Sequence, residues 1–334
     1  MLDGHGLTTL EICAGGGGQA IGLEQAGFEH VGLVEQNPHA CATLRLNRPG
    51  WKVIEGDVRD FLPGPHIGQR QIDLLSGGIP CTPYSIAGKQ LGSTDERDLL
   101  PEALRLARTL HPRAIMLENV SELVKSSKFK YTREKLSADL QDLGYSVRMD
   151  LVDAQNFGVP QRRVRAVVVA MRPDAFQHFN LPLGNWELPP TVGEVLEDSM
   201  GSKGWTGAKE WARLANDIAP TLVGGSMKHG GGDLGPDRAK NSWAKLAVNG
   251  NSLSDDVPDP DFVLQHGVGR GGRTGYPRLT AHQAALIQGF PPDWQFAGGK
   301  TARYKQIGNA FPPPVARTVG TSIAAALHAA STAG

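Results

Sequence analysis

The stretch "LTTLEICAGGGGQAIGLEQAG", residues 7–27, decides the fold. An apolar run that enters a row of glycines and leaves with helical spacing, closed by Gly27, predicts a strand, a tight turn and a helix. Such a turn lets backbone N–H groups approach a polar or anionic ligand at the start of the helix. Gly15, Gly17 and Ala20 satisfy the G-x-G-x-x-G/A pattern, and Glu35 follows about 20 residues later, where a ribose-binding acid belongs.

This stretch alone leaves two alternatives open, a nicotinamide-binding turn and a plain strand-to-helix turn. Asp57 ends a further predicted strand, in "EGDVRD". Its carboxylate is suited to accept a hydrogen bond from an adenine amino group, but an acid in this position is also an ordinary helix cap. The glycine turn and Asp57 therefore indicate a ligand site without identifying the ligand.

Apolar runs and helical periods alternate through the first half of the chain. Strands are expected at 7–15, 30–37, 51–57, 72–78, 113–120, 145–154 and 163–171, and helices at 18–27, 39–47, 99–110 and 133–144. This alternation predicts an α/β fold with a doubly wound, mainly parallel sheet. Such sheets bind ligands at the carboxyl ends of their strands.

The chain changes character near Pro182 and again near Pro277. The stretch between them is rich in glycine and proline, as in "VGGSMKHGGGDLGPDRAKNSWAK", and shows little periodicity, whereas a final helix is expected at 313–330. The sequence therefore predicts a ligand-binding α/β domain over 1–182, a small irregular inserted domain over 183–277, and a return to the first domain over 278–334.

Composition narrows the class of protein. Lys plus Arg and Asp plus Glu both number 34 in 334 residues, so the formal net charge is zero, which leaves room for a local basic cleft. Three cysteines fit a reducing compartment better than a disulfide framework. The first residues lack the pattern of a signal peptide, and "AVVVAM" is too short to span a bilayer. We expect a soluble, cytosolic protein.

Two residues at strand ends are candidates for chemistry. Cys81 lies in "GGIPCTPYS" after the strand at 72–78, and Glu118 lies in "LENV" at the end of the strand at 113–120. A buried cysteine is usually inert, but a thiol in a glycine-flanked loop at a ligand crevice can be exposed and its pKa lowered. A carboxylate on an apolar strand needs a partner or a function, because burying it unpaired is costly.

Six motifs in order carry a resemblance to a known family. They are "CAGGGGQ", "GGIPCTPYS", "LENV", "QNFGVPQRRVR", "RLTAHQAALIQGFPPDW" and "YKQIGNAFPPPVA". The series resembles that of the S-adenosylmethionine-dependent DNA (cytosine-5) methyltransferases of bacterial restriction-modification systems. The resemblance covers almost the whole chain apart from the insertion, and it implies a Rossmann-like methyltransferase domain.

The resemblance implies a covalent mechanism. Cys81 matches the nucleophile that adds to carbon 6 of cytosine, so that carbon 5 can attack a methyl group. Glu118 matches the residue that hydrogen-bonds N3 and the amino group of the base. Arg163 and Arg165 match a pair near the target cytosine, at its phosphate or O2 edge. The sequence indicates no dedicated base for the carbon 5 proton, and water serves this role in the family.

The resemblance also assigns the cofactor site, for S-adenosylmethionine without a metal. Its residues are Cys13, Ala14, Gly15, Gly17, Gly18, Glu35, Asp57, Val58, Pro80, Asn309 and Ala310. Gly15, Gly17 and Gly18 surround the methionine part, Glu35 pairs with the ribose and Asp57 with adenine. A nicotinamide enzyme fits less well, because it leaves Cys81 and Glu118 without a function.

Three residues depart from the family pattern. Glu11 and Cys13 stand where the family usually has Asp and Phe, so an aromatic contact to adenine is missing. Thr82 stands where glutamine is commoner, a residue associated with the gap that the flipped cytosine leaves. These departures leave Cys81 and Glu118 untouched.

The implied partner is double-stranded DNA, from which the target cytosine is flipped out. The insertion then serves target recognition, and its candidate DNA contacts are Lys228, His229, Arg238, Lys240, Arg270 and Arg273. A monomer acting at a short palindromic site is expected, in a bacterial cytoplasm and on the nucleoid, with a cognate restriction endonuclease that forms no stable complex with it. A tRNA cytosine-5 methyltransferase and a non-catalytic DNA-binding member of the family remain alternatives.

Overall fold

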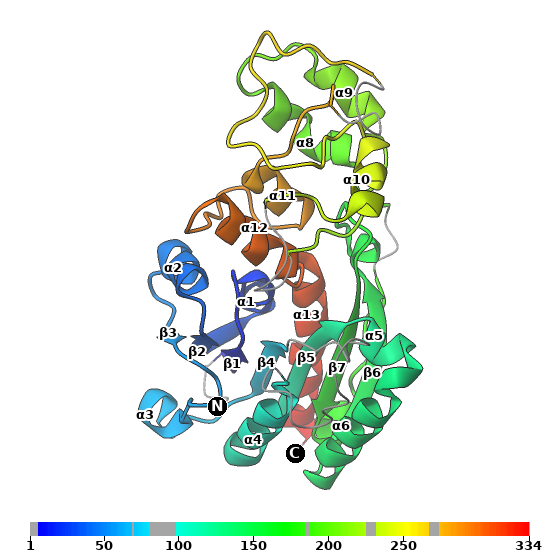
Figure 1. The fold of residues 1–334 in the computed structure, drawn as a ribbon. Coiled ribbons are helices and arrows are strands. Elements are labelled where there is room, and N and C mark those ends of the chain that lie inside the picture. The colour runs from blue at the N-terminus through cyan, green and yellow to red at the C-terminus, as the bar shows by residue number, and fades with distance from the viewer. Residues whose placement is uncertain are drawn as a thin grey trace. The chain divides into compact units, whose positions relative to one another are not determined.

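The computed structural model describes residues 6–68, 70–79, 98–184, 188–224, 232–266 and 274–333. The chain forms two compact units (Figure 1). The first unit comprises Met1–Val152, Val164–Leu183 and Val315–Gly334, and the second comprises Asp153–Arg163 and Gly184–Pro314. Cys81 and Pro80 lie outside the described residues.

The first unit is built on a seven-stranded sheet of order β3-β2-β1-β4-β5-β7-β6. Its strands are β1 (Leu7–Ile12), β2 (Phe28–Glu35), β3 (Val53–Glu55), β4 (Leu74–Gly78), β5 (Ala114–Val120), β6 (Ser146–Asp153) and β7 (Val164–Met171). The neighbours from β3 to β5 pair in parallel, whereas β7 runs antiparallel to β5. The predicted α/β fold with a mainly parallel sheet is confirmed.

Helices cover this sheet. They are α1 (Gly18–Gln25), α2 (Pro38–Asn47), α3 (Pro63–Ile67), α4 (Leu100–Leu110), α5 (Glu122–Lys125), α6 (Lys130–Asp142), α7 (Pro173–Phe176) and α13 (Pro313–Ala333), with a 3₁₀ turn η1 (Ser127–Phe129). The start of α2 shows local control by the sequence. Asn37 accepts hydrogen bonds from the N–H groups of His39 and Ala40, and Pro38 occupies a position where a missing N–H costs nothing.

The core of the first unit joins the sheet to α4 and α6. Apolar side chains of β1, β4 and β5 form one buried cluster with those of the two helices. In Figure 1, α4 and α6 lie in front of the sheet and α13 behind it. In the part of the chain that the structure describes, no helix combines the length and apolarity that crossing a bilayer requires.

The second unit contains more regular structure than the sequence indicates. Its elements are the 3₁₀ turn η2 (Ala154–Phe157) and the helices α8 (Val192–Gly201), α9 (Ala208–Leu214), α10 (Asp237–Ala244), α11 (Ala281–Ile287) and α12 (Lys300–Asn309). Capping boxes at Thr191 and Thr280 start α8 and α11. Trp211 and Trp243 are fully buried between these short elements.

Candidate active site

The glycine turn at the end of β1 forms as predicted. Gly15 has φ +56° and Gly17 has φ +90°, left-handed conformations that glycine adopts at little cost. Gly17 precedes α1, and its N–H donates to the carbonyl of Ala14 over 3.1 Å. A Cβ added to Gly15 would meet nothing within 4 Å, so this side of the turn faces open space.

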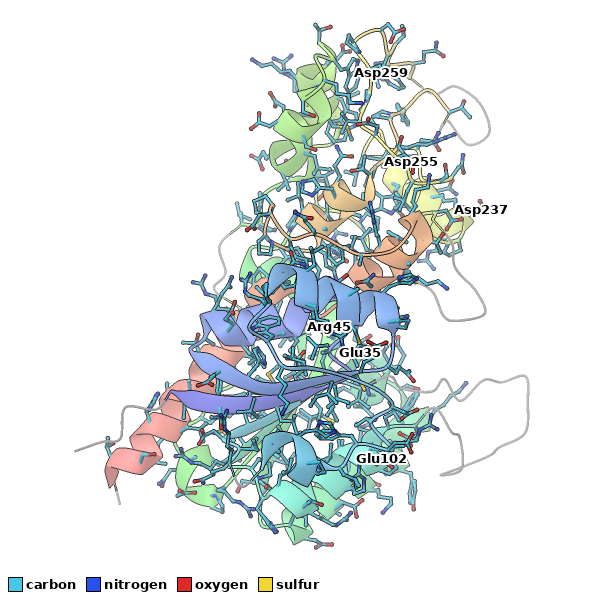
Figure 2. All side chains as sticks on the ribbon, turned by 90° about the vertical axis from the view of Figure 1, so that its left-hand side faces the viewer. Glu35, Arg45, Glu102, Asp237, Asp255 and Asp259 are labelled. Carbon is cyan, nitrogen blue, oxygen red and sulfur yellow. The ribbon has the colours of Figure 1, made fainter. Side chains whose placement is uncertain are left out.

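Glu35, at the end of β2, is hydrogen-bonded to the glycine turn (labelled in Figure 2). Its carboxylate accepts hydrogen bonds from the N–H of Gly15 over 2.8 Å and from the N–H of Asn37 over 2.7 Å. Burial raises its pKa above the ordinary range, although these N–H donors oppose that shift. Glu35, which follows the turn by about 20 residues in the sequence, is thus in direct contact with it.

Asp57 and Val58 follow β3. Asp57 accepts a hydrogen bond from Nε of Arg59 over 2.9 Å, and this hydrogen bonding holds its pKa below the ordinary range. Val58 is buried, and its carbonyl accepts from Arg105 over 2.9 Å. Asp57 therefore provides an ionised hydrogen-bond acceptor next to the apolar side chain of Val58.

The two thiols that the structure describes are poor nucleophiles. Burial raises the pKa of Cys13 to about 12, with a further contribution from the negative charge of Glu35. Burial also raises the pKa of Cys41 to about 12. Both remain protonated near neutral pH, whereas the thiolate is the reactive form.

Glu118 and Arg165 form an ion pair within the first unit. In the antiparallel ladder of β5 and β7, Arg165 lies opposite Val120, two residues from Glu118, so both side chains share a face of the sheet. Nε of Arg165 lies 3.0 Å from Oε1 of Glu118, and their side chains are 17% and 10% exposed, respectively. The structure thus brings together two residues that the sequence places 47 positions apart.

Asn119 fixes the end of β4 beside this pair, and the sequence analysis did not single it out. Its side-chain amide donates to the carbonyl of Ile79 over 3.0 Å, and the N–H of Ile79 donates to the carbonyl of Glu118 over 3.0 Å. Ile79 directly precedes Pro80 and Cys81 in the sequence. The signal was present in the motif "LENV", where Asn119 follows Glu118.

Arg163, Asn309 and Ala310 belong to the second unit. Arg163 is 1% exposed, and its guanidinium donates to backbone carbonyls that include that of Ala310, over 2.9 Å. Asn309 ends α12, and Ala310 follows it. Arg163 and Arg165, although paired in the motif "QRRVR", thus have different surroundings.

The predicted DNA contacts are only partly described. Lys240 pairs with Asp233 over 2.9 Å, and Arg238 is exposed on α10, the helix that begins at Asp237 (Figure 2). Lys228, His229, Arg270 and Arg273 lie outside the described residues, as does Thr82. Among the residues with described positions, no group of three or more His, Cys, Asp or Glu could hold a metal ion.

Glu11 is fully buried on β1, and its carboxyl oxygens have no hydrogen-bond partner among the described residues. The side-chain amide of Gln19, at the start of α1, is also buried and unpartnered in that part of the chain. Burial, reinforced by the charge of Glu35, raises the pKa of Glu11 well above its ordinary value. Burial therefore favours the protonated form of Glu11 in the folded protein.

This protonation predicts a pH-dependent effect of Glu11→Gln. Between the ordinary carboxyl pKa of about 4.3 and the higher folded value, folding takes up a proton, so this group's contribution to stability is lost as pH rises. Glutamine avoids the proton uptake. The variant should gain in free energy of unfolding relative to the parent from pH 5 to pH 8, by up to about 1.4 kcal/mol per pH unit.

Urea unfolding of both proteins at pH 5, 6.5 and 8 measures this difference. Glu29→Gln, at an exposed position on β2, is the matched control for the loss of a carboxyl group. A difference for Glu11→Gln that stays constant or shrinks as the pH rises would show that Glu11 is ionised in the folded protein.

Comparison with known proteins identifies the family of this chain. Residues 7–325 match the family model described as C-5 cytosine-specific DNA methylase. The Type II methyltransferase M.NgoMIV of Neisseria gonorrhoeae is 48% identical over 96% of this chain and 98% of its own length. The Type II methyltransferase M.NaeI of Lentzea aerocolonigenes is 49% identical over 96% of this chain and 76% of its own length.

Two solved structures share the fold. A mutant of Spodoptera frugiperda DNMT2 aligns with a TM-score of 0.66 at 17% identity, over 95% of this chain and 99% of that one. A putative DNA modification methyltransferase from an Escherichia coli prophage aligns with a TM-score of 0.62 at 21% identity, over 96% and 98%. At these identities the likeness concerns the fold alone. The family model and the two Type II relatives show that this chain belongs to the C-5 cytosine-specific DNA methylase family.

Proposed function

We propose that this protein transfers a methyl group from S-adenosylmethionine to carbon 5 of a cytosine in double-stranded DNA, through a covalent adduct with Cys81. The observation that supports this most directly is the ion pair between Glu118 and Arg165 at the end of β5, with Asn119 fixing the residue two positions before Cys81. Together, a carboxyl group and a guanidinium can form hydrogen bonds with the donor and acceptor groups along one edge of cytosine.

The glycine turn and its neighbours fit the cofactor chemically. Open space beside Gly15, the carboxyl group of Glu35 and the ionised carboxylate of Asp57 suit an amino acid chain, ribose hydroxyls and an adenine amino group, respectively. Cys13, Ala14, Gly17, Gly18, Val58 and Pro80 complete the proposed site in the first unit, and the resemblance adds Asn309 and Ala310. When bound, S-adenosylmethionine supplies an electrophilic methyl group on a sulfonium.

In the proposed mechanism, the Cys81 thiolate forms a bond to carbon 6 of the base. Electron density moves through the ring to carbon 5, and Glu118, in its protonated form, donates its proton to N3 and accepts a hydrogen bond from the amino group, which stabilises the charge that develops. Arg165 holds both Glu118 and the O2 edge. As the bond from the methyl group to carbon 5 forms, its bond to the sulfonium sulfur would break and leave a neutral thioether. Water then removes the carbon 5 proton and the thiolate leaves carbon 6, which restores the aromatic ring.

Carbon 6 of a stacked base is out of reach of a side chain, so the cytosine must leave the duplex, at a cost of a few kcal/mol in unstacking. We assign cofactor binding and catalysis to residues 1–182 and 278–334, and target recognition to residues 183–277. The basic residues of that region then contact DNA, and affinity should fall steeply with salt.

The relatives' names suggest the biological setting. Both are Type II methyltransferases, so we propose that this protein modifies DNA in a restriction-modification system. A cognate endonuclease would act on the same site without a stable complex, and the methyltransferase would act as a monomer. A tRNA substrate is not favoured, because the relatives of high identity are named as Type II methyltransferases.

Bisulfite sequencing tests this function. Genomic DNA is compared from a methylation-free bacterial host that expresses the chain and from the same host with an empty vector. Near-complete protection of one cytosine in one recurring word, seen only with the chain, is the expected result. Protection scattered over unrelated cytosines would contradict sequence-specific methylation, and conversion of every cytosine would contradict DNA as the substrate.

A further inference from the structure

The second unit contains a buried polar network that the proposed mechanism does not use. Its three side chains, Gln161, Arg163 and Gln288, come from two distant parts of the sequence and are 0%, 1% and 0% exposed. Burying such groups is costly unless their hydrogen bonds are satisfied. Their partners therefore indicate what the network holds.

Arg163 donates to backbone carbonyls of two segments. Nη1 donates to the carbonyl of Leu222, and Nη2 donates to those of Gly308 and Ala310, each over 2.9 Å. The two carbonyls bound by Nη2 flank Asn309, which the proposed function assigns to the cofactor. A phosphate or a base could reach this guanidinium only if these segments moved.

The two glutamines complete the same contacts. Gln161 donates to Oε1 of Gln288 over 2.6 Å and accepts from the N–H of Leu222 over 2.9 Å. Gln288 in turn donates to the carbonyl of Ala310 over 2.6 Å. Ala310 thus accepts hydrogen bonds from both Arg163 and Gln288.

The segments held by this network are also packed tightly. A Cβ added to Gly308 would lie 2.3 Å from the backbone nitrogen of Gly224, and one added to Gly224 would lie 2.6 Å from Oδ1 of Asn309. Both distances are far below van der Waals contact, so only glycine fits at either position. The backbone beside Asn309 is therefore tightly packed and held through Ala310, while the Asn309 side chain itself is exposed.

We propose that Gln161, Arg163 and Gln288 are positioning residues that hold residues 308–310 so that Asn309 meets the cofactor. This inference rests on the proposed cofactor role of Asn309. It gives Arg163 a function different from the DNA contact that the family resemblance implies. It also assigns a function to Gln288, which has none in the proposed mechanism. Arg165, the other arginine of "QRRVR", keeps its place beside Glu118.

Arg163→Lys tests the proposal in the full chain, because lysine keeps the charge but cannot donate to three carbonyls from a planar fork. We expect the Kd for S-adenosylmethionine, measured by calorimetry well below the melting temperature, to rise about tenfold or more. The kcat at saturating cofactor and the KM for DNA should change less than about threefold, since misplacing a positioning group weakens one contact rather than every step. Arg162→Lys, at the exposed neighbouring position, should leave all three unchanged.

Gln288→Met, which keeps the length of the side chain but removes its donor to Ala310, should shift the cofactor Kd in the same direction. It also serves as the deciding variant if Arg163→Lys fails to fold. An unchanged cofactor Kd together with a raised KM for DNA in Arg163→Lys would overturn the proposal and place Arg163 against DNA.

Asn309→Ala separates this proposal from the function on which it rests. If Asn309→Ala weakens cofactor binding and the two network variants do not, the positioning role is wrong while the cofactor site stands. If Asn309→Ala itself leaves the cofactor Kd unchanged, the assignment of Asn309 to the cofactor fails, and the positioning role fails with it.

Discussion

Cys81→Ala is expected to lower methyl transfer to the background of the assay. Alanine cannot add to carbon 6, and without that bond carbon 5 of cytosine is a poor nucleophile, so the pathway loses its first step. Initial rates of transfer of a tritiated methyl group to DNA measure the effect. Binding of S-adenosylmethionine and of DNA should stay within a few fold of the parent, since the change removes one sulfur atom.

Cys41→Ala is the matched control for this variant. Cys41 is buried on α2, and burial raises its pKa to about 12, so its thiol stays protonated. The kcat of Cys41→Ala should stay within about threefold of the parent value, because Cys41 makes no contact with the transition state. Residual activity in Cys81→Ala well above background would show that the nucleophile is elsewhere.

Glu118→Gln is expected to lower kcat on the order of 100-fold to 10,000-fold, the range typical of a lost transition-state donor or general acid. Glutamine keeps the shape of the side chain but loses the charge that pairs with Arg165. It also lacks the proton that Glu118 donates to N3 in the proposed mechanism. Single-turnover methyl transfer at saturating cofactor isolates this step from product release.

Glu122→Gln controls for the loss of an acid near the same strand end. Glu122 is exposed at the start of α5, four positions after Glu118, and its replacement should leave the rate unchanged. If Glu118→Gln instead raised KM for DNA and left the single-turnover rate intact, Glu118 would hold the base without stabilising the transition state.

The sheet was largely predictable from the sequence, whereas the short helices were not. Buried strands such as β5 and β7 are mainly apolar runs, and polar residues mark their ends. Helices of 7 to 10 residues such as α8, α9 and α10 carry too few turns to show a clear period, and their stability comes from packing around buried tryptophans. Local patterning cannot reveal such packing.

The candidate site likewise contains contacts that the sequence predicts and contacts that it does not. The contact between Glu35 and the glycine turn follows from sequence spacing, because both lie at carboxyl ends of adjacent parallel strands. Arg163 and Arg165 look equivalent in "QRRVR", yet β7 begins between them, at Val164, and only Arg165 shares a sheet face with Glu118. The contacts of Gln288 with Gln161 and Ala310 join segments more than 20 residues apart, and a single sequence contains no signal for them.

Covalent trapping tests the central claim most directly. A DNA duplex is prepared that carries the recognition sequence found by bisulfite sequencing, with 5-fluorocytosine in place of the target cytosine. It is incubated with the protein and S-adenosylmethionine. Fluorine cannot leave carbon 5 as a proton does, so elimination is blocked and the adduct should persist as a complex stable to denaturing electrophoresis. The account predicts this complex for the parent protein and its absence for Cys81→Ala. A parent protein that methylates the ordinary word yet forms no such complex, or a complex that persists in Cys81→Ala, would contradict it.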